Sequence, residues 1–355
     1  MSARRATIHD VARRAGVSAT TVSHTFSGNG VVATATQQRI RRAATELGYR
    51  PDALARGLRS SRLGAIALVE RTLMAGNAER VLGIDYFLRF AGAAAIAAAD
   101  QGFALMFVAD PWAADAPSAA LACDGFIVTE PVADDPLLIA LDGYGIPYVS
   151  VGRDPARAIH RPGSVVDIAT ELITVRALDH LVDGGARRVA VLVGTDRNEW
   201  TLDTVTHYRA WAGSRGMSPV VLQEPEADGA DGGRRAGAEL MAAAPDVDAV
   251  YVLTAEHAVG LQSALAERGR DGVLLVCGSD AEALRTAHPP ISAVDLQPEA
   301  LAHEAVMRLL TLIDGVERPA MAPEHARILV RSTSGAGGEH RAAPSHSQQA
   351  LRITR

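Results

Sequence analysis

The chain has 355 residues, long enough for two or three packed units, and a net charge of −6. No apolar run reaches membrane-spanning length and the N-terminus lacks a signal-peptide core, so we expect a soluble, cytoplasmic protein. Two cysteines, Cys123 and Cys277, lie far apart in apolar runs without metal-ligand spacing. This pattern predicts buried free thiols in a reducing compartment and no metal site.

Charge is distributed unevenly along the chain. Residues 1–62 contain eleven arginines and three acidic residues, a net charge of +8. The remainder contains 24 arginines and 38 acidic residues, a net charge of −14. A merely solvated charged face would not concentrate one sign at one terminus. The asymmetry therefore predicts phosphate binding by the N-terminal segment.

The segment that begins at Thr7 is typical of two short helices around a tight turn. Thr7 is expected to cap the first helix, with Asp10 as its capping-box partner. Gly16 is expected to end this helix, where a left-handed residue is needed. Its buried face is formed by the residues at helical spacing, Ile8, Val11, Ala12 and Ala15.

Ser18 is expected to cap the second helix, residues 19–26, in which the apolar Val22 turns inward. The side chains expected on its outer side are short, namely Ala19, Thr20, Ser23 and His24. Alanine in the first helix, glycine in the turn and valine just after it let two helices cross closely, as a DNA-reading helix-turn-helix requires. The segment is therefore predicted to bind DNA.

A third helix is expected at residues 36–47, ended by Gly48 and capped by Thr34, because Ala33 has no capping side chain. Its apolar face is expected to contain Ile40, Ala43, Ala44 and Leu47. Residues 52–61 have the spacing of one or two helical turns but are too short to be stable alone. A helix is expected in this segment only when it packs against something else.

From residue 63 the chain alternates apolar strands with helices. Strands are expected at residues 65–69, 103–109, 125–129, 147–151, 188–193, 249–253 and 273–278. Helices are expected at residues 91–101, 170–183, 201–215 and 256–268. This alternation predicts parallel sheets covered by helices on both faces. The strands are too many for one ordinary sheet, so we expect two similar α/β lobes with a ligand held between them.

Three motifs stand out: Thr7-Ile-x-Asp-Val-Ala-x-x-Ala-Gly-Val-Ser-x-x-Thr-Val-Ser, Glu46-Leu-Gly-Tyr-Arg-Pro51 and Ala55-Arg-x-Leu58-Arg59-Ser60. With them the chain resembles the lactose-repressor (LacI) family of bacterial transcriptional regulators over roughly residues 7–334. The resemblance implies an all-α helix-turn-helix head and an α/β body similar to two-lobed periplasmic binding proteins. On this basis we expect four parts of the chain. Residues 1–50 are expected to form the DNA-binding head and residues 51–62 a hinge helix or linker. Residues 63–333 are expected to form an effector-binding and dimerisation body, and residues 334–355 a disordered tail.

The resemblance also implies a dimer on a near-palindromic operator, with the second helix in the major groove of each half-site. The implied DNA-binding residues are Ala19, Thr20, Thr21, Ser23, His24, Ser27, Thr36, Ala55 and Leu58. Among these, Thr21, Ser23, Ser27 and Thr36 are expected to contact phosphates, which position the domain without determining base preference.

Two of these residues carry more specific hypotheses. The family usually has arginine at His24, so we expect His24 to contact a base edge and to prefer an altered operator. The alternative is that it touches only phosphate or solvent. Leu58 is expected to wedge, with its dimer mate, into the minor groove at the operator centre. The alternative is that it packs on the body as a linker residue.

The effector site departs further from the family. Sugar-binding members usually have an arginine near Thr204, an Asn-Asp pair at Thr254-Ala255 and an aspartate at Asp280, of which only the last is kept. The effector-binding residues expected from this comparison are Trp200, Asp203, Thr204, Thr254 and Asp280, with His207 and Tyr208 nearby. Singly, a residue of these types is more often structural. The expected ligand is a small molecule, such as a sugar or a related metabolite.

These expectations combine into a ligand-responsive, homodimeric transcriptional repressor. The alternative is a transport-type solute-binding protein, which the body alone would fit but which the basic head and the absence of a signal peptide argue against. No enzyme activity, cofactor or membrane partner is expected, because no nucleophile elbow, phosphate loop or dinucleotide fingerprint occurs. The segment after Ser334 has no leucine heptads, so a dimer is expected rather than a tetramer.

Overall fold

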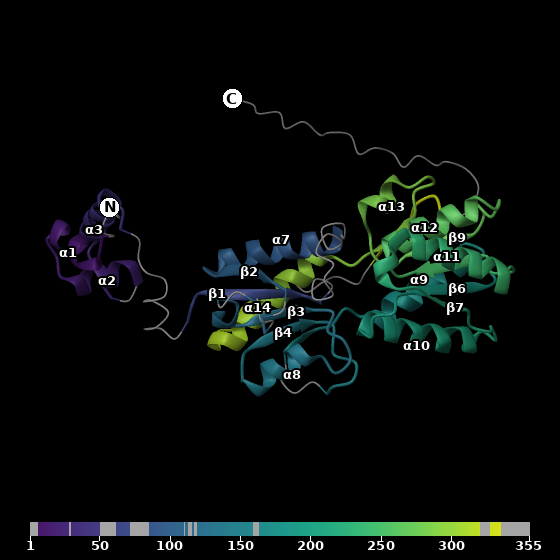
Figure 1. The fold of residues 1–355 in the computed structure, drawn as a ribbon, viewed down its shortest axis with the longest axis horizontal. Helices are drawn as coiled ribbons and strands as arrows, with labels where there is room; N and C mark the ends of the chain where they lie inside the picture. The colour runs from purple at the N-terminus through teal and green to yellow at the C-terminus, as the bar shows by residue number, and fades with distance from the viewer. Residues whose placement is uncertain are drawn as a thin grey trace, which may run out of the picture. The chain divides into compact units, whose positions relative to one another are not determined.

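The computed structural model describes residues 6–27, 30–49, 62–71, 85–109, 111–112, 116, 119–158, 163–319 and 327–334. The predicted hinge, apart from Arg62, and the tail beyond Ser334 lie outside the described residues. Three N-terminal helices have a core of their own, and the α/β elements divide between two units (Figure 1).

The head consists of α1 (Ile8–Ala15), α2 (Ala19–Ser27) and α3 (Thr34–Glu46). Its core contains the residues at helical spacing, Val11, Ala12, Ala15, Val22, Ile40, Ala43 and Ala44. The predicted start of α3 is wrong by two residues, and Thr34 is not its cap: the N-cap is Ala33, without a side-chain hydrogen bond. Instead, Gln37 Nε2 donates to the carbonyl oxygen of Val32 at 2.9 Å. Leu47, predicted on the buried face, is exposed because the helix ends before it.

The first unit contains a parallel sheet with the strand order β2-β1-β3-β4-β5. Its strands are β1 (Ala65–Glu70), β2 (Ala104–Val108), β3 (Phe126–Thr129), β4 (Tyr148–Val151) and β5 (Val165–Val166). Helix α7 (Asp85–Asp100) lies on one face and α8 (Pro136–Gly143) on the other (Figure 1). Every residue of β1, β3 and β4 is buried, which explains their continuous apolar sequences.

One helix of the first unit comes from a distant part of the chain. Helix α14 (Pro298–Asp314) follows the second unit in sequence but packs against the first sheet near Gly125. A β-carbon at Gly125 would lie 2.9 Å from Leu309 Cδ1 and 2.9 Å from the carbonyl oxygen of Pro147. Glycine is therefore needed where α14 crosses the start of β3.

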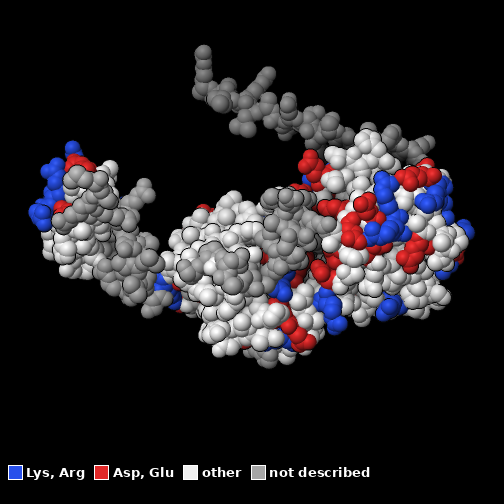
Figure 2. All heavy atoms as spheres, viewed as in Figure 1, with Lys and Arg blue, Asp and Glu red and all other residues white. Residues whose placement is uncertain are grey.

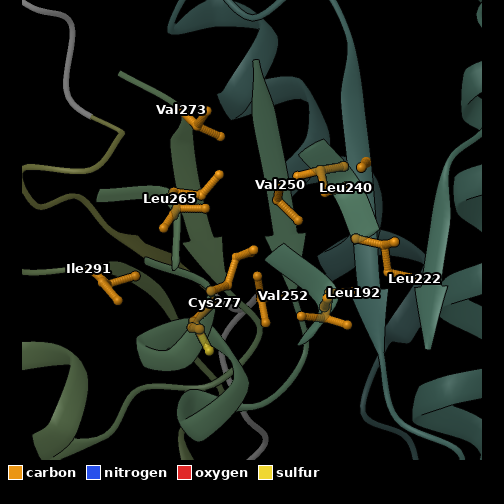
Figure 3. Close-up of a cluster of buried hydrophobic side chains, with 14 of the residues drawn as sticks. Leu192, Leu222, Leu240, Val250, Val252, Leu265, Val273, Cys277 and Ile291 are labelled. Atoms are coloured by element: carbon orange, nitrogen blue, oxygen red, sulfur yellow. The ribbon is translucent and has the colours of Figure 1, made fainter. Parts of the chain in front are cut away.

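The second unit contains a sheet with the order β11-β10-β9-β8-β6-β7, in which only the β10–β11 pair is antiparallel. Its strands are β6 (Val189–Val193), β7 (Val221–Gln223), β8 (Ala249–Val252), β9 (Leu274–Cys277), β10 (Ser292–Asp295) and β11 (Arg327–Leu329). Helices α9 (Thr170–Asp183) and α10 (Glu199–Ser214) cover one face. The other face carries α11 (Gly229–Ala243), α12 (Ala255–Ala266) and α13 (Glu282–Thr286), and Figure 3 shows its core.

Helix α11 is not predicted by the sequence pattern, because it contains several glycines, which are poor helix formers. The structure explains them by close packing of α11 on α12. A β-carbon at Gly233 would lie 2.1 Å from the carbonyl oxygen of His257, and one at Gly260 would lie 1.9 Å from that of Ala230. The two helix backbones therefore touch, and only glycine permits that approach.

No helix in the part of the chain that the structure describes has the length and apolar content to cross a membrane. Both cysteines are free and buried, as predicted. Burial raises the pKa of the Cys123 thiol to about 11 and that of the Cys277 thiol to about 12. The nearby carboxylate of Asp124 adds to the shift at Cys123.

We expect both thiols to be inert toward Ellman's reagent in the native protein at pH 8. The thiolate is the reactive form, and at that pH only about one thiol in a thousand is ionised when its pKa is about 11. Raising the pH should increase the reaction rate, and unfolding in guanidinium chloride should release both thiols. Rapid reaction of one equivalent in the native protein at pH 8 would contradict the buried positions.

Candidate nucleic-acid interface

Local interactions define both ends of α1 and the start of α2. Thr7 and Asp10 form the predicted capping box: Thr7 N donates to Asp10 Oδ2 at 2.9 Å, and Asp10 N donates to Thr7 Oγ1 at 3.4 Å. Gly16 ends α1 with a left-handed φ of 64°. Ser18 then begins α2, since its Oγ accepts from Thr21 N at 3.1 Å. The start of α1, the end of α1 and the start of α2 are therefore as predicted from the sequence.

Arginines of α1 and α3 tie these helices together. Arg39 Nε donates to the carbonyl oxygen of Ala15 at 2.9 Å, which satisfies an acceptor at the end of α1. Arg14 Nη2 lies 2.8 Å from Glu46 Oε2, and Arg42 Nε lies 3.2 Å from Oε1. Hydrogen bonding to Arg14 holds the pKa of Glu46 below its usual value. Arginine side chains gather over this side of the head (Figure 2).

Helix α2 presents a short polar surface. Thr20 and His24, four residues apart and so on one face, are exposed, while Thr21 and Ser23 are half-buried. Val22 is fully buried beneath them. The side chain of Thr21 is partly engaged, because its Oγ1 lies 2.8 Å from Ser18 Oγ.

Other predicted DNA-binding residues fall in less exposed or undescribed places. Ala19 was expected on the outer face, but it is half-buried and packs against the head core, because it lies one turn before Val22. Thr36, in the first turn of α3, is half-buried. The side chain of Ser27 and the residues Ala55 and Leu58 lie outside what the structure describes.

In the second unit, three of the predicted effector-binding residues follow adjacent parallel strands. Trp200 comes after β6, Thr254 after β8 and Asp280 after β9, and these strands are neighbours in the sheet. The carboxyl edge of a parallel sheet is where ligands bind in open α/β folds. The indole of Trp200 lies over Gly278, since a β-carbon there would be 2.9 Å from Trp200 Cζ2.

Asp280 is held by two arginines that the sequence pattern does not reveal. Its Oδ2 accepts from Arg285 Nη1 at 2.7 Å and its Oδ1 accepts from Arg331 Nη2 at 2.7 Å. The side chain of Asp280 is only 8% exposed. Arg331 is 51 positions away in sequence, so spacing alone could not pair it with Asp280. Both carboxylate oxygens of this residue are therefore already engaged.

Other residues near the predicted effector site have structural partners. Thr204 is fully buried, with its Oγ1 3.3 Å from Thr174 Oγ1 between α10 and α9. Tyr208 is fully buried and its hydroxyl donates to the carbonyl oxygen of Val189 at 2.7 Å. Asp203 and His207, also on α10, are half-buried.

Two buried hydroxyls at this edge have no hydrogen-bond partner among the described residues, those of Tyr251 and Thr254. The hydroxyl of Tyr251 approaches Gly278, where a β-carbon would lie 3.2 Å from it. Tyr251 is not predicted as a site residue from the sequence, because a tyrosine within an apolar strand is more typical of a core residue. Its polar end nevertheless lies beside Trp200 through their shared contact with Gly278.

Two parts of the chain match known protein families. Residues 7–52 match bacterial regulatory proteins of the lacI family, and residues 178–334 match a periplasmic binding protein-like domain. The HTH-type transcriptional regulator CelR of Thermobifida fusca is 28% identical over 340 residues, which cover 93% of this chain and 98% of that protein.

Solved structures have a similar fold over most of the chain. A complex of the transcriptional regulator CelR with cellobiose is 26% identical, with a TM-score of 0.66, and the match covers 93% of this chain and 100% of that one. A lac repressor dimer bound to operator and the anti-inducer ONPF has the same fold, with a TM-score of 0.76 at 21% identity, covering 93% and 99% of the two chains. With its helix-turn-helix head and its periplasmic-binding-like body, the chain belongs to the lacI family and is a DNA-binding transcriptional regulator.

Proposed function

We propose that this regulator is a repressor that binds a near-palindromic operator as a homodimer and responds to a small-molecule effector. The observation that carries the proposal is the outward face of α2, where Thr20 and His24 are exposed above the buried Val22. A short, polar helix face lets the backbone approach base edges in the major groove. We assign residues 1–50 to DNA binding, 51–62 to the hinge, 63–333 to the body and 334–355 to a tail.

Thr20 and His24 are the candidates for base contacts, because they are the exposed residues of this face. Thr21, Ser23, Ser27 and Thr36 are proposed to contact phosphates and so to fix the orientation of the head on the duplex. Ala19 is half-buried against the head core, so its proposed role is to let the backbone of α2 approach the DNA closely rather than to form a polar contact. Ala55 and Leu58 are proposed to contact the operator between the two half-sites.

The effector is proposed to be a sugar-like molecule bound at the carboxyl edge of the second sheet. Trp200, which is 9% exposed with its indole over Gly278, is proposed to contact a sugar ring, and Thr254 has a hydroxyl without a hydrogen-bond partner among the described residues. A similar regulator, CelR, has been solved as a complex with cellobiose. Effector binding would change operator affinity through a coupling free energy between the two sites.

Dimerisation is proposed to use an apolar surface of the first unit formed by α7 and β2. Leu88 and Ile96 of α7 are 47% and 67% exposed, and Phe107 of β2 is 50% exposed. β2 is an edge strand, so one side of its backbone is unpaired in the sheet. An apolar surface of this kind marks an interaction site, and a twofold dimer would place it against its own copy.

Deleting residues 1–62 should abolish operator binding and leave a folded body, because all proposed DNA contacts lie in that segment. Gel-shift assays on genomic fragments compare the full chain with the truncated one, and circular dichroism checks that the body is folded. Binding by the full chain should also weaken steeply with added salt, as phosphate contacts require. A truncated body that still shifts the same fragments contradicts the proposal.

Ile96→Glu should convert the dimer to a monomer with little change in melting temperature, because the side chain is exposed within one chain. In a twofold interface each new carboxylate would be buried against an apolar copy of the surface, which is strongly unfavourable. Ile139→Glu in α8, where Ile139 is 49% exposed, is the matched control and should leave the dimer intact. Sedimentation velocity distinguishes the outcomes, and an Ile96→Glu protein that remains dimeric excludes this surface.

Leu58→Ala should lower operator affinity by roughly 1–3 kcal/mol, the scale of losing a wedge that sustains a kinked base step. Non-specific DNA binding should barely change, since it depends on arginine–phosphate contacts. Body stability should also remain nearly constant. Melting curves and operator titrations on both proteins provide the measurement. Earlier melting with unchanged operator affinity and DNA bend would instead place Leu58 against the body.

A further inference from the structure

His24 and Gly30 lie against each other in the head. His24 is exposed in the last turns of α2, and Gly30 lies in the connection from α2 to α3. A β-carbon at Gly30 would lie 2.8 Å from Nδ1 of His24, 3.2 Å from Cγ and 3.5 Å from Cε1. The first distance is too short for real carbon–nitrogen packing, so the approach depends on the absence of a side chain at position 30.

The backbone of Gly30 imposes a second requirement for glycine. Its φ is 124°, in a region that residues with a β-carbon rarely adopt. The three ring atoms nearest to Gly30 are Nδ1 and its two bonded carbons, so the contact covers the Nδ1 edge of the imidazole. Nε2, separated from Nδ1 by Cε1, is not among these three atoms, and the side chain of His24 is exposed.

We propose that Gly30 is a positioning residue that holds the imidazole of His24 so that Nε2 alone meets a base edge. The inference rests on the proposed function of α2 in base contacts. With one ring nitrogen available, His24 forms a single hydrogen bond, as a donor to guanine N7 or O6 or as an acceptor from the amino group of adenine or cytosine. An arginine, by contrast, can form two parallel bonds to guanine.

Restricting the imidazole of His24 before DNA binds has its largest effect when the side chain forms only one hydrogen bond to the base. A freely rotating side chain loses rotamer freedom when it binds, and one hydrogen bond offsets that loss less well than two. The ring occupies the space that a β-carbon at position 30 would need, so glycine at that position lets the ring adopt this place before DNA arrives. The pair His24–Gly30 is therefore the specificity-determining unit at one base pair of each half-site, and the loop contributes as much as the helix.

The test is a double-mutant cycle on the full chain, using Gly30→Ala, His24→Ala and the double variant. Each protein is titrated against operators that differ by one base pair at a time. His24→Ala should flatten the preference at one base pair of each half-site. Gly30→Ala should weaken binding to the preferred operator roughly tenfold, the scale of one lost base contact, and should have a much smaller effect on operator affinity once His24 is alanine, when only the backbone strain remains. An equal loss in both backgrounds overturns the proposal.

Gly48→Ala is the matched control for backbone strain. Gly48 is also in the head and has a φ of 63°, but a β-carbon there would meet no atom within 4 Å. This variant should lose stability and keep the base preference of the wild type. A change in preference that matches that of Gly30→Ala would show general softening of the head and would overturn the positioning role.

Thermal unfolding of the same variants provides a measurement that does not require DNA. Because the clash of Gly30→Ala is with the His24 ring, His24→Ala should restore part of the lost melting temperature in the double variant. It should restore none of the loss caused by Gly48→Ala. Absence of any restoration overturns the contact, even if Gly30→Ala folds too poorly for operator titration. A wild-type chain that binds no DNA rejects the proposed function, while this thermal cycle still reports on the contact.

Discussion

The geometry of the head depends on the left-handed turn at Gly16. This residue ends α1 and lets Val17 N donate back to the carbonyl oxygen of Ala12 at 3.0 Å. Ser18 can then start α2 at once, so Val22 reaches the same core as the apolar face of α1. A residue with a β-carbon at position 16 would strain the turn and move α2. The outward face of α2 is thus a consequence of how tightly the chain turns before it.

Much of this head could be predicted because its determinants are local. The capping pair Thr7 and Asp10 is three residues apart, and the buried Val11 and Ala15 follow helical spacing. The strands of the two sheets could be predicted for a similar reason, since residues buried on both faces form continuous apolar runs. Helix α11 could not, because its glycines are explained only by the backbone of α12, which lies further along the chain. Local propensity and tertiary packing conflict there, and packing prevails.

The candidate sites could be predicted only as separate residues, not as pairs. Sequence reasoning identified Asp280 but not its partner Arg331, and it identified His24 but not the glycine that lies against its ring. Both partners are ordinary residues in loops or at strand ends, so nothing in the local pattern marks them. Ala19 shows the converse error: a small side chain at the start of α2 fits either an outer or an inner position, and only the packing of the head determines which.

The engaged state of Asp280 changes what the carboxyl edge of the second sheet can recognise. A ligand hydroxyl that approaches Asp280 must compete with hydrogen bonds from Arg285 and Arg331, and such charge-assisted bonds are about twice as strong as neutral ones. The hydroxyls of Tyr251 and Thr254 have no hydrogen-bond partner among the described residues, so each carries an uncompensated desolvation penalty, and Tyr251 is fully buried. For the proposed effector, contacts with Trp200 and Thr254 would therefore contribute more to recognition than Asp280, whose two carboxylate oxygens are already engaged.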